Sequence, residues 1–279
     1  MKEFWTRFAR NKGAVIGLAF LVLVLLIAAF APILYPESPW KMTGAPFRPP
    51  GAQPGHFLGT DTLGRDIAAG IAHGARVSIL VGLLSTAVAV GIGVLAGAIA
   101  GYFGGIVDSA VMRFTEFFQT IPSVVLAIVL VAILQPSIQS IIIAISIVSW
   151  PPVARLVRGE FLSLRSREFV EAARVIGQSD ARIIITQILP NSLSPVIVTA
   201  SLMVATAILL ESAISFLGLG DRNLMSWGYM IGAARTVIRE AWWMSFFPGF
   251  AILLTVLAIN LVGEGLNDAL NPRLARQGR

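Results

Sequence analysis

The chain has no cysteine, only two histidines and few charged side chains. Without cysteine it can form no disulfide, no thiolate metal site and no cysteine nucleophile, and His56 and His73 leave little for a metal. Charged residues make up 13% of the 279 residues, against about 25% in a soluble domain. Hydrophobic residues make up 56%. The composition therefore predicts a membrane protein and gives no support to a metal-dependent enzyme.

Six apolar stretches are long enough to cross a bilayer, whose core of about 30 Å needs roughly 20 residues of helix. Of all the charged side chains, only that of Glu211 falls inside these stretches. The sequence thus predicts an all-α membrane protein with six transmembrane helices. The predicted spans are 14–34, 77–101, 117–134, 138–154, 196–218 and 246–263.

The distribution of lysine and arginine predicts how these spans are oriented. With the N-terminus inside, the inner segments hold fourteen basic residues and the outer segments hold seven. Cytoplasmic loops of membrane proteins carry the excess of Lys and Arg, so we expect both termini in the cytoplasm. The same bias accounts for most of the net charge of +6 without nucleic acid as a partner.

Small residues occupy every fourth position of one face of the second span, at Ala89, Gly93, Gly97 and Gly101. Such a stripe lets another helix approach closely, because packing rather than a hydrophobic driving force joins helices in lipid. A close contact with another helix of the same chain is favoured over dimerisation.

Prolines interrupt two of the predicted spans. Pro122 lies near the start of the third span, and Pro151 and Pro152 follow Trp150 at the end of the fourth. Because proline lacks a backbone donor and clashes with the preceding turn, we expect kinked or ended helices at these points.

Glu211 is the one ionisable residue at membrane depth, about 10 Å from the outer end of its span at 1.5 Å per residue. A charge there is costly unless it is paired, protonated or facing water. Two interpretations therefore stay open: a functional group in a transport pathway, and a polar tether to a neighbouring helix or loop. The first would suit an ion-gradient-coupled secondary transporter or channel. Two features stand against that class of protein: the spans contain a single carboxylate, and the sequence has no evident internal repeat.

The predicted outer loop between residues 35 and 75 begins rich in proline and ends in the segment 58–66. The glycines of this segment allow tight turns, and its acidic and basic side chains can pair. By themselves these residues predict a stapled loop rather than a reactive site. The residues of this outer loop motif are Gly59, Thr60, Asp61, Gly64, Arg65 and Asp66.

The longest predicted inner segment, 155–195, contains an amphipathic pattern. Phe169, Ala172, Ala173 and Ile176 recur with the spacing of one helix face. The charged residues between them, Glu168, Glu171 and Arg174, occupy the other faces. We therefore expect a short helix over residues 168–176.

Turn and cap residues follow this helix. Gly177 suits a left-handed stop, Ser179 can cap a second helix, and Pro190 is expected to end that second helix. The result is a helix-turn-helix exposed to the cytosol, which can lie on lipid, read DNA or dock on a partner protein. The apolar face is small for lipid insertion, and a DNA reader does not fit a six-span bundle, so docking in a groove of a partner is favoured.

Three motifs resemble those of a known family. Glu171-Ala172-Ala173, Gly177 and the run from Gln187 to Pro190 together resemble the EAA loop in the permease subunits of ABC importers, although Gln187 stands where an aliphatic residue is usual. The segments 58–66 and 215–220 resemble the C-type permease of the dipeptide, oligopeptide and nickel import group. The likeness extends over nearly the whole chain.

The resemblance implies a permease subunit of an ATP-driven importer in the bacterial inner membrane, with dipeptides or oligopeptides as substrates. It implies a heterodimer with a second permease, two cytoplasmic ATPase subunits that bind ATP and Mg, and an extracytoplasmic substrate-binding protein. The chain itself contains no Gly-Lys pair, so it can build no P-loop. We expect no cofactor on this chain and no enzymatic activity of its own.

We expect two regions along the chain. Residues 1–76 form an N-terminal region with the first span and the outer loop, and residues 77–279 form a core permease domain with five spans and the coupling loop 155–195. The resemblance implies that this loop docks on the ATPase subunits through Glu168, Phe169, Glu171, Ala172, Ala173, Arg174, Gly177 and Pro190.

Overall fold

The computed structural model describes residues 2–270. The basic tail counted above, with Arg273, Arg276 and Arg279, lies outside the described residues. Within the described range the regular structure is helical, apart from isolated bridges that pair Met42 with Arg65 and Thr60 with Asp66.

Five helical segments are long and apolar enough to cross a membrane, and a sixth candidate span is broken in two. The unbroken segments are Lys12–Leu34 (α2), Ile67–Phe103 (α3), Ile138–Leu164 (α6), Asp180–Leu219 (α8, η1, α9 and η2) and Trp243–Leu270 (α11). The broken span consists of Gly105–Thr120 (α4) and Ser123–Leu134 (α5), which meet at a bend of 84°. The prediction of an all-α membrane protein is confirmed, and the third span is the one that departs from a simple helix.

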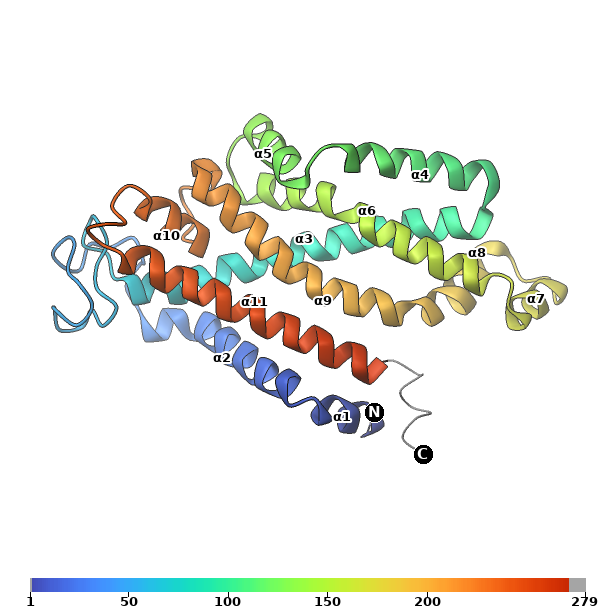
Figure 1. Cartoon of the computed structure of the whole chain (residues 1–279), viewed down its shortest axis with the longest axis horizontal. Coiled ribbons are helices and arrows are strands. Elements are labelled where there is room, and N and C mark those ends of the chain that lie inside the picture. Colours follow the sequence, from blue (N-terminus) through green and yellow to red (C-terminus); the bar gives the residue numbers. More distant parts are fainter. Residues whose placement is uncertain (1, 271–279) are drawn as a thin grey trace.

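The long helices run side by side along the long axis of the molecule (Figure 1). The loop between α2 and α3 lies at one end, near the short helix Trp227–Ala234 (α10), and we name this the loop end. The opposite end holds the short helix Glu168–Val175 (α7) together with the turn between α3 and α4, and we name this the α7 end. The short helix Lys2–Arg10 (α1) packs beside the end of α11.

The small-residue stripe of α3 packs against α6. A Cβ atom on Gly97 would lie 2.4 Å from the carbonyl oxygen of Ala154, and one on Gly101 would lie 2.5 Å from the Cβ of Phe161. No residue larger than glycine fits at these distances, so the two backbones touch. The stripe is a helix contact within the chain, as its spacing predicts.

The prolines behave differently from one another. Pro122 stands at the break between α4 and α5, as expected. The expectation that Pro151 and Pro152 could end their helix is wrong, because α6 continues through both to Leu164. Close packing of this part of α6 against α3, with Val153 fully buried, outweighs the loss of the backbone donors.

Candidate functional site

The short helix α7 occupies the place that the amphipathic pattern predicts. It runs over Glu168–Val175, and Gly177 follows it with φ of +78°, the left-handed conformation that glycine adopts without strain. The N–H of Gly177 bonds to the carbonyl of Arg174 at 2.9 Å, and that of Gln178 bonds to the carbonyl of Ala173 at 3.1 Å. These bonds close the helix in the manner of a Schellman cap.

The structure divides the predicted apolar face of α7 between the interior and the surface. Ala173 is buried, together with Val170, which the sequence pattern did not single out. Phe169 and Ala172 are exposed, and Ile176, just after the helix, is 73% exposed. The exposed side of α7 therefore presents apolar side chains, beside the exposed Glu168, Glu171 and Arg174.

The second helix of the pair is the start of a membrane helix. The helix Asp180–Ile183 (α8) leads through one wide π-helical stretch, Ile184–Ile188 (η1), into Leu189–Ile214 (α9). Ser179 takes the backbone position of a cap, but its side chain makes no capping bond. Pro190 does not end the helix: it lies in the first turn of α9, where the preceding π-helical register has already shifted the backbone bonds.

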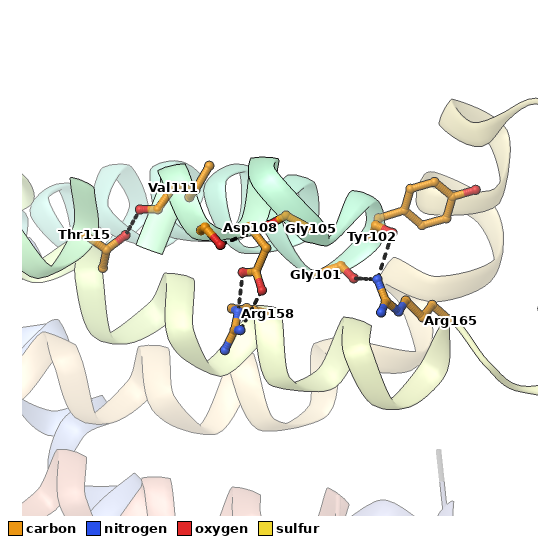
Figure 2. A network of polar contacts seen from close by, with 9 residues as sticks. Gly101, Tyr102, Gly105, Asp108, Val111, Thr115, Arg158 and Arg165 are labelled. Atoms are coloured by element: carbon orange, nitrogen blue, oxygen red, sulfur yellow. Dashed lines mark hydrogen bonds and ion pairs between the residues drawn. The ribbon is translucent and has the colours of Figure 1, made fainter. Parts of the chain in front are cut away.

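Polar contacts tie this helix pair to the end of α3. The hydroxyl of Tyr102 donates to a carboxylate oxygen of Asp180 at 2.5 Å, and the guanidinium of Arg174 lies 5.5 Å from the centre of the Tyr102 ring. Arg165, just after α6, donates to the carbonyls of Gly101 and Tyr102 at 3.2 and 3.3 Å (Figure 2). Helices α3, α6, α7 and α8 thus meet around one tyrosine.

An ion pair joins α4 to α6 at the same end of the molecule. The guanidinium of Arg158 donates two bonds to the carboxylate of Asp108, at 2.5 and 2.6 Å (Figure 2). Paired bonds of this kind fix orientation as well as distance. Sequence reasoning missed these polar partners, and the available signal was only that charged residues cluster just beyond the apolar runs.

The outer loop motif is a staple, as its residues predict. Thr60 is fully buried: its hydroxyl donates to the carbonyl of Ala45 at 2.6 Å and accepts from the N–H of Arg48 at 3.0 Å. Its own carbonyl accepts from the indole N–H of Trp243 at 3.0 Å, which fastens the loop to the start of α11. Gly59, with φ of +85°, lies against the carbonyl of Arg48, so a side chain there would collide with backbone.

The remainder of the motif forms a tight turn. One carboxylate oxygen of Asp61 accepts from the N–H groups of Leu63 and Arg65, both at 2.8 Å, and Gly64 has φ of +78°. The guanidinium of Arg65 lies 4.8 Å from the ring centre of Trp40. Local bonds of this kind hold the turn in one shape.

Asp66 ends the motif and begins α3. Its carboxylate accepts from the N–H of Ala68 at 2.9 Å, which is the bond of a helix cap. Burial raises the pKa of the Asp66 carboxyl above its usual value, and the bond from Ala68 and the positive charge of His56 oppose part of that rise.

Glu211 is buried near the loop end of α9. Its carboxylate accepts hydroxyl bonds from Ser215 and Ser226, both at 2.8 Å, and lies 3.5 Å from the hydroxyl of Ser212. Ser226 is also the cap of α10, since its hydroxyl accepts from the N–H of Tyr229 at 3.1 Å. Among the described residues, Glu211 has hydroxyl partners and forms no ion pair.

The predicted groups fall into two places in the fold, because Glu211 lies near the loop end, as the outer loop motif does. The α7 residues lie at one end of the bundle and the outer loop motif at the other (Figure 1). No group of three or more His, Asp or Glu side chains able to hold a metal ion occurs in residues 2–270. The arrangement is a helical bundle with the partly exposed helix α7 at one end and a hydrogen-bonded loop at the other.

Two family models match the sequence. One, described as "Binding-protein-dependent transport system inner membrane component", matches residues 93–276. The other, described as "N-terminal TM domain of oligopeptide transport permease C", matches residues 1–50.

Curated relatives match over nearly the full chain. The dipeptide transport system permease protein DppC of Escherichia coli K12 is 48% identical over 280 residues, which cover 98% of this chain and 93% of that protein. The di/tripeptide transport system permease protein DppC of Pseudomonas aeruginosa UCBPP-PA14 is 42% identical over 284 residues, covering 98% of this chain and 92% of that protein.

Solved structures share the fold at low sequence identity. A chain of the inward-facing MetNI methionine ABC transporter aligns with a TM-score of 0.60 at 17% identity, over 72% of this chain and 96% of that one. A chain of an amino acid ABC transporter solved with histidines aligns with a TM-score of 0.55 at 13% identity, over 71% of this chain and 92% of that one.

Proposed function

This chain belongs to the family of binding-protein-dependent transport system inner membrane components, and we propose that it is a permease subunit for dipeptides or short oligopeptides. A permease subunit of an ABC importer works in the inner membrane, and its ATPase is a separate subunit. The observation that carries the substrate class is the identity of 48% to a dipeptide permease over 98% of this chain.

The exposed side of α7 is the surface that we assign to the ATPase subunits. Phe169, Ala172 and Ile176 project apolar surface from a short helix, and apolar anchors of this kind seat a helix in a groove of a partner. Val170 and Ala173 hold the helix to its own chain. Movement of the docked partner would then reach the bundle through Tyr102 and Asp180.

The remaining proposals concern the assembly. The basic bias of the sequence supports the α7 end as the cytoplasmic side, with both termini there. A second, different permease would complete the pathway, two ATPase subunits would hold ATP and Mg, and an extracytoplasmic binding protein would deliver the peptide. Residues 1–76 would form the N-terminal region with the first span and the outer loop, and residues 77–279 the core permease domain. The chain would carry no ATP site, because the sequence has no Gly-Lys pair.

Reconstituted transport tests this function. The chain would be purified with its partner permease, ATPase subunits and binding protein, placed in proteoliposomes, and supplied with labelled dialanine. We expect uptake to require ATP on the side of the membrane that carries the ATPase subunits. We also expect it to require the binding protein on the opposite side. Uptake driven by an ion gradient without ATP would contradict the proposal.

A further inference from the structure

A cavity of about 280 Å³ opens at the loop end, between the end of the α9 segment and α10. Its walls come from the π-helical stretch Ser215–Leu219 (η2), from the residues that follow it, and from the exposed side of α10. Two guanidinium groups, those of Arg222 and Arg235, line this cavity, and both side chains are exposed. No carboxylate is among the residues that line it.

Glycines give the cavity its shape. Gly218, with φ of +88°, ends the helical segment and turns the chain away. Gly228 brings α10 against the end of α9, because a Cβ on Gly228 would lie 2.6 Å from the Cα of Ser212. Gly232 brings α10 against η2, because a Cβ there would lie 2.9 Å from the carbonyl oxygen of Ser215. The two walls are therefore held together by direct backbone packing.

Two acidic residues close to the cavity in the sequence or behind its wall, Asp221 and Glu211, have hydrogen-bond partners elsewhere. Asp221, next to Arg222 in the chain, accepts from the N–H of Asn223 at 2.8 Å and from the N–H of Ile138 at the start of α6 at 3.1 Å. Glu211 lies behind the cavity wall, where the hydroxyl of Ser215 donates to it. Its carboxylate faces buried hydroxyl groups rather than the arginines.

The two arginines are consequently without acidic partners in the described part of the chain. Arg235 makes one long bond, from its guanidinium to the carbonyl of Phe216 at 3.4 Å, which leaves its other donors open. Arginine presents donors in a planar fork that matches a carboxylate or a phosphate. A cavity lined by two guanidinium groups and by no carboxylate favours a ligand with an anionic group.

We propose that this cavity binds the terminal carboxylate of a peptide as the peptide enters the bundle from the loop end. This inference rests on the proposed function, because a zwitterionic peptide supplies one free carboxylate at neutral pH. The cavity volume holds a carboxylate with the residue that carries it, but not a whole oligopeptide. Arg222 and Arg235 would act as substrate-positioning residues at the outer mouth of the pathway.

The experiment uses the complete importer in lipid nanodiscs. Binding of dialanine, and of dialanine with its carboxylate converted to an amide, is measured by saturation-transfer NMR without the binding protein. Wild type should bind the free acid about tenfold more tightly than the amide. The double variant Arg222→Gln with Arg235→Gln should lose this preference, whereas the double lysine variant should keep part of it.

Arg239→Gln is the matched control, since Arg239 is an exposed arginine of the same outer segment that does not line the cavity. It should bind like wild type. Import of dialanine at saturating loaded binding protein should fall about tenfold in the double glutamine variant and remain unchanged in the control. Size-exclusion behaviour and the presence of all subunits in the purified complex establish that each variant is assembled.

Three outcomes would overturn the inference. The first is a double glutamine variant that keeps wild-type preference for the free acid. The second is a double glutamine variant that binds and imports dialanine normally and has lost only bound phosphatidylglycerol, which would make the cavity a lipid site. The third is a wild-type importer that carries no dialanine at all, and only that outcome would also refute the proposed function.

Discussion

The hydroxyl of Tyr102, at the end of α3, donates a hydrogen bond of 2.5 Å to the carboxylate of Asp180 in the first turn of α8. The two residues are 78 positions apart in the sequence. The bond joins the helix that carries the glycine stripe to the segment that follows α7, and Arg174 of α7 lies over the same ring. Polar contacts as well as packing therefore join α7 and α8 to the end of α3.

Tyr102→Phe removes this hydroxyl and leaves the ring under Arg174. We expect the importer to assemble normally and to transport less substrate for each ATP hydrolysed, because α7 and α3 lose about 1 kcal/mol of coupling. Parallel measurements of uptake and ATP hydrolysis in proteoliposomes give this ratio. Tyr35→Phe serves as a control at the loop end, and a Tyr102→Phe ratio equal to that of wild type would contradict the role.

Gly97→Val should destabilise the bundle by about 1–3 kcal/mol, because its side chain meets the carbonyl oxygen of Ala154. The same helix offers a matched control in Gly91, around which a Cβ atom would meet nothing within 4 Å. Gly91→Ala should leave stability unchanged or slightly raised, since alanine favours helix. Thermal unfolding in detergent compares the two, and equal melting temperatures would show that α3 and α6 are not in backbone contact.

The spans could be predicted from hydropathy because lipid selects against charge along the whole helix. Helix ends could not: α3 begins at Ile67 and α6 continues to Leu164, since hydrogen-bonded helix extends beyond the apolar run that hydropathy detects. Two pairs of apolar residues on α7 have the same spacing of three, Phe169 with Ala172 and Val170 with Ala173, so the pattern does not say which pair is buried. That choice depends on the helices packed behind it.

The polar contacts of the site were beyond sequence reasoning for a different reason. Asp108 and Arg158 are 50 positions apart, and each resembles any other charge just outside a span. Their pairing follows from the return of α4 beside α6 after the turn at Gly104, which no local pattern specifies. By contrast, the turns at Gly177 and at Asp61 depend on near neighbours, and the sequence predicts both, whereas the bond from Trp243 to Thr60 spans 183 positions.

Gly177→Val tests the turn that follows α7. The left-handed conformation at φ of +78° costs roughly 1–2 kcal/mol for a residue with a side chain, and more for a branched one, although a side chain would meet no neighbour. We expect membrane insertion to persist while ATP-driven uptake falls. Gly177→Asn should retain most activity, because asparagine tolerates this conformation. Wild-type uptake by the valine variant would remove the turn from the docking mechanism.

Asp66→Asn tests the raised pKa of the Asp66 carboxyl. Because the folded-state pKa is raised, the folded protein holds this proton more tightly than the unfolded chain, so stability is lost as pH rises from the unfolded pKa through the folded pKa. Asparagine keeps the helix cap without this penalty. We expect the variant to be the more stable protein at pH 7 and this advantage to shrink towards pH 4. A difference in melting temperature between the variant and wild type that is the same at pH 7 and pH 4 would contradict the raised pKa of Asp66.

Glu211→Gln and Glu211→Leu separate a tether from a titrating group. The glutamine carbonyl can still accept from Ser215 and Ser226, which donate to Glu211 at 2.8 Å, so we expect assembly and ATP-driven uptake to survive with modest loss. Leucine leaves the hydroxyls of buried Ser215 and Ser226 without this acceptor, at a cost of about 1–3 kcal/mol, and should loosen α10 from α9. Thermal stability and uptake are measured for both variants. A well-folded glutamine variant that transports nothing, together with loss of wild-type uptake on adding an uncoupler at constant ATP, would instead assign Glu211 to proton transfer, because an amide cannot titrate.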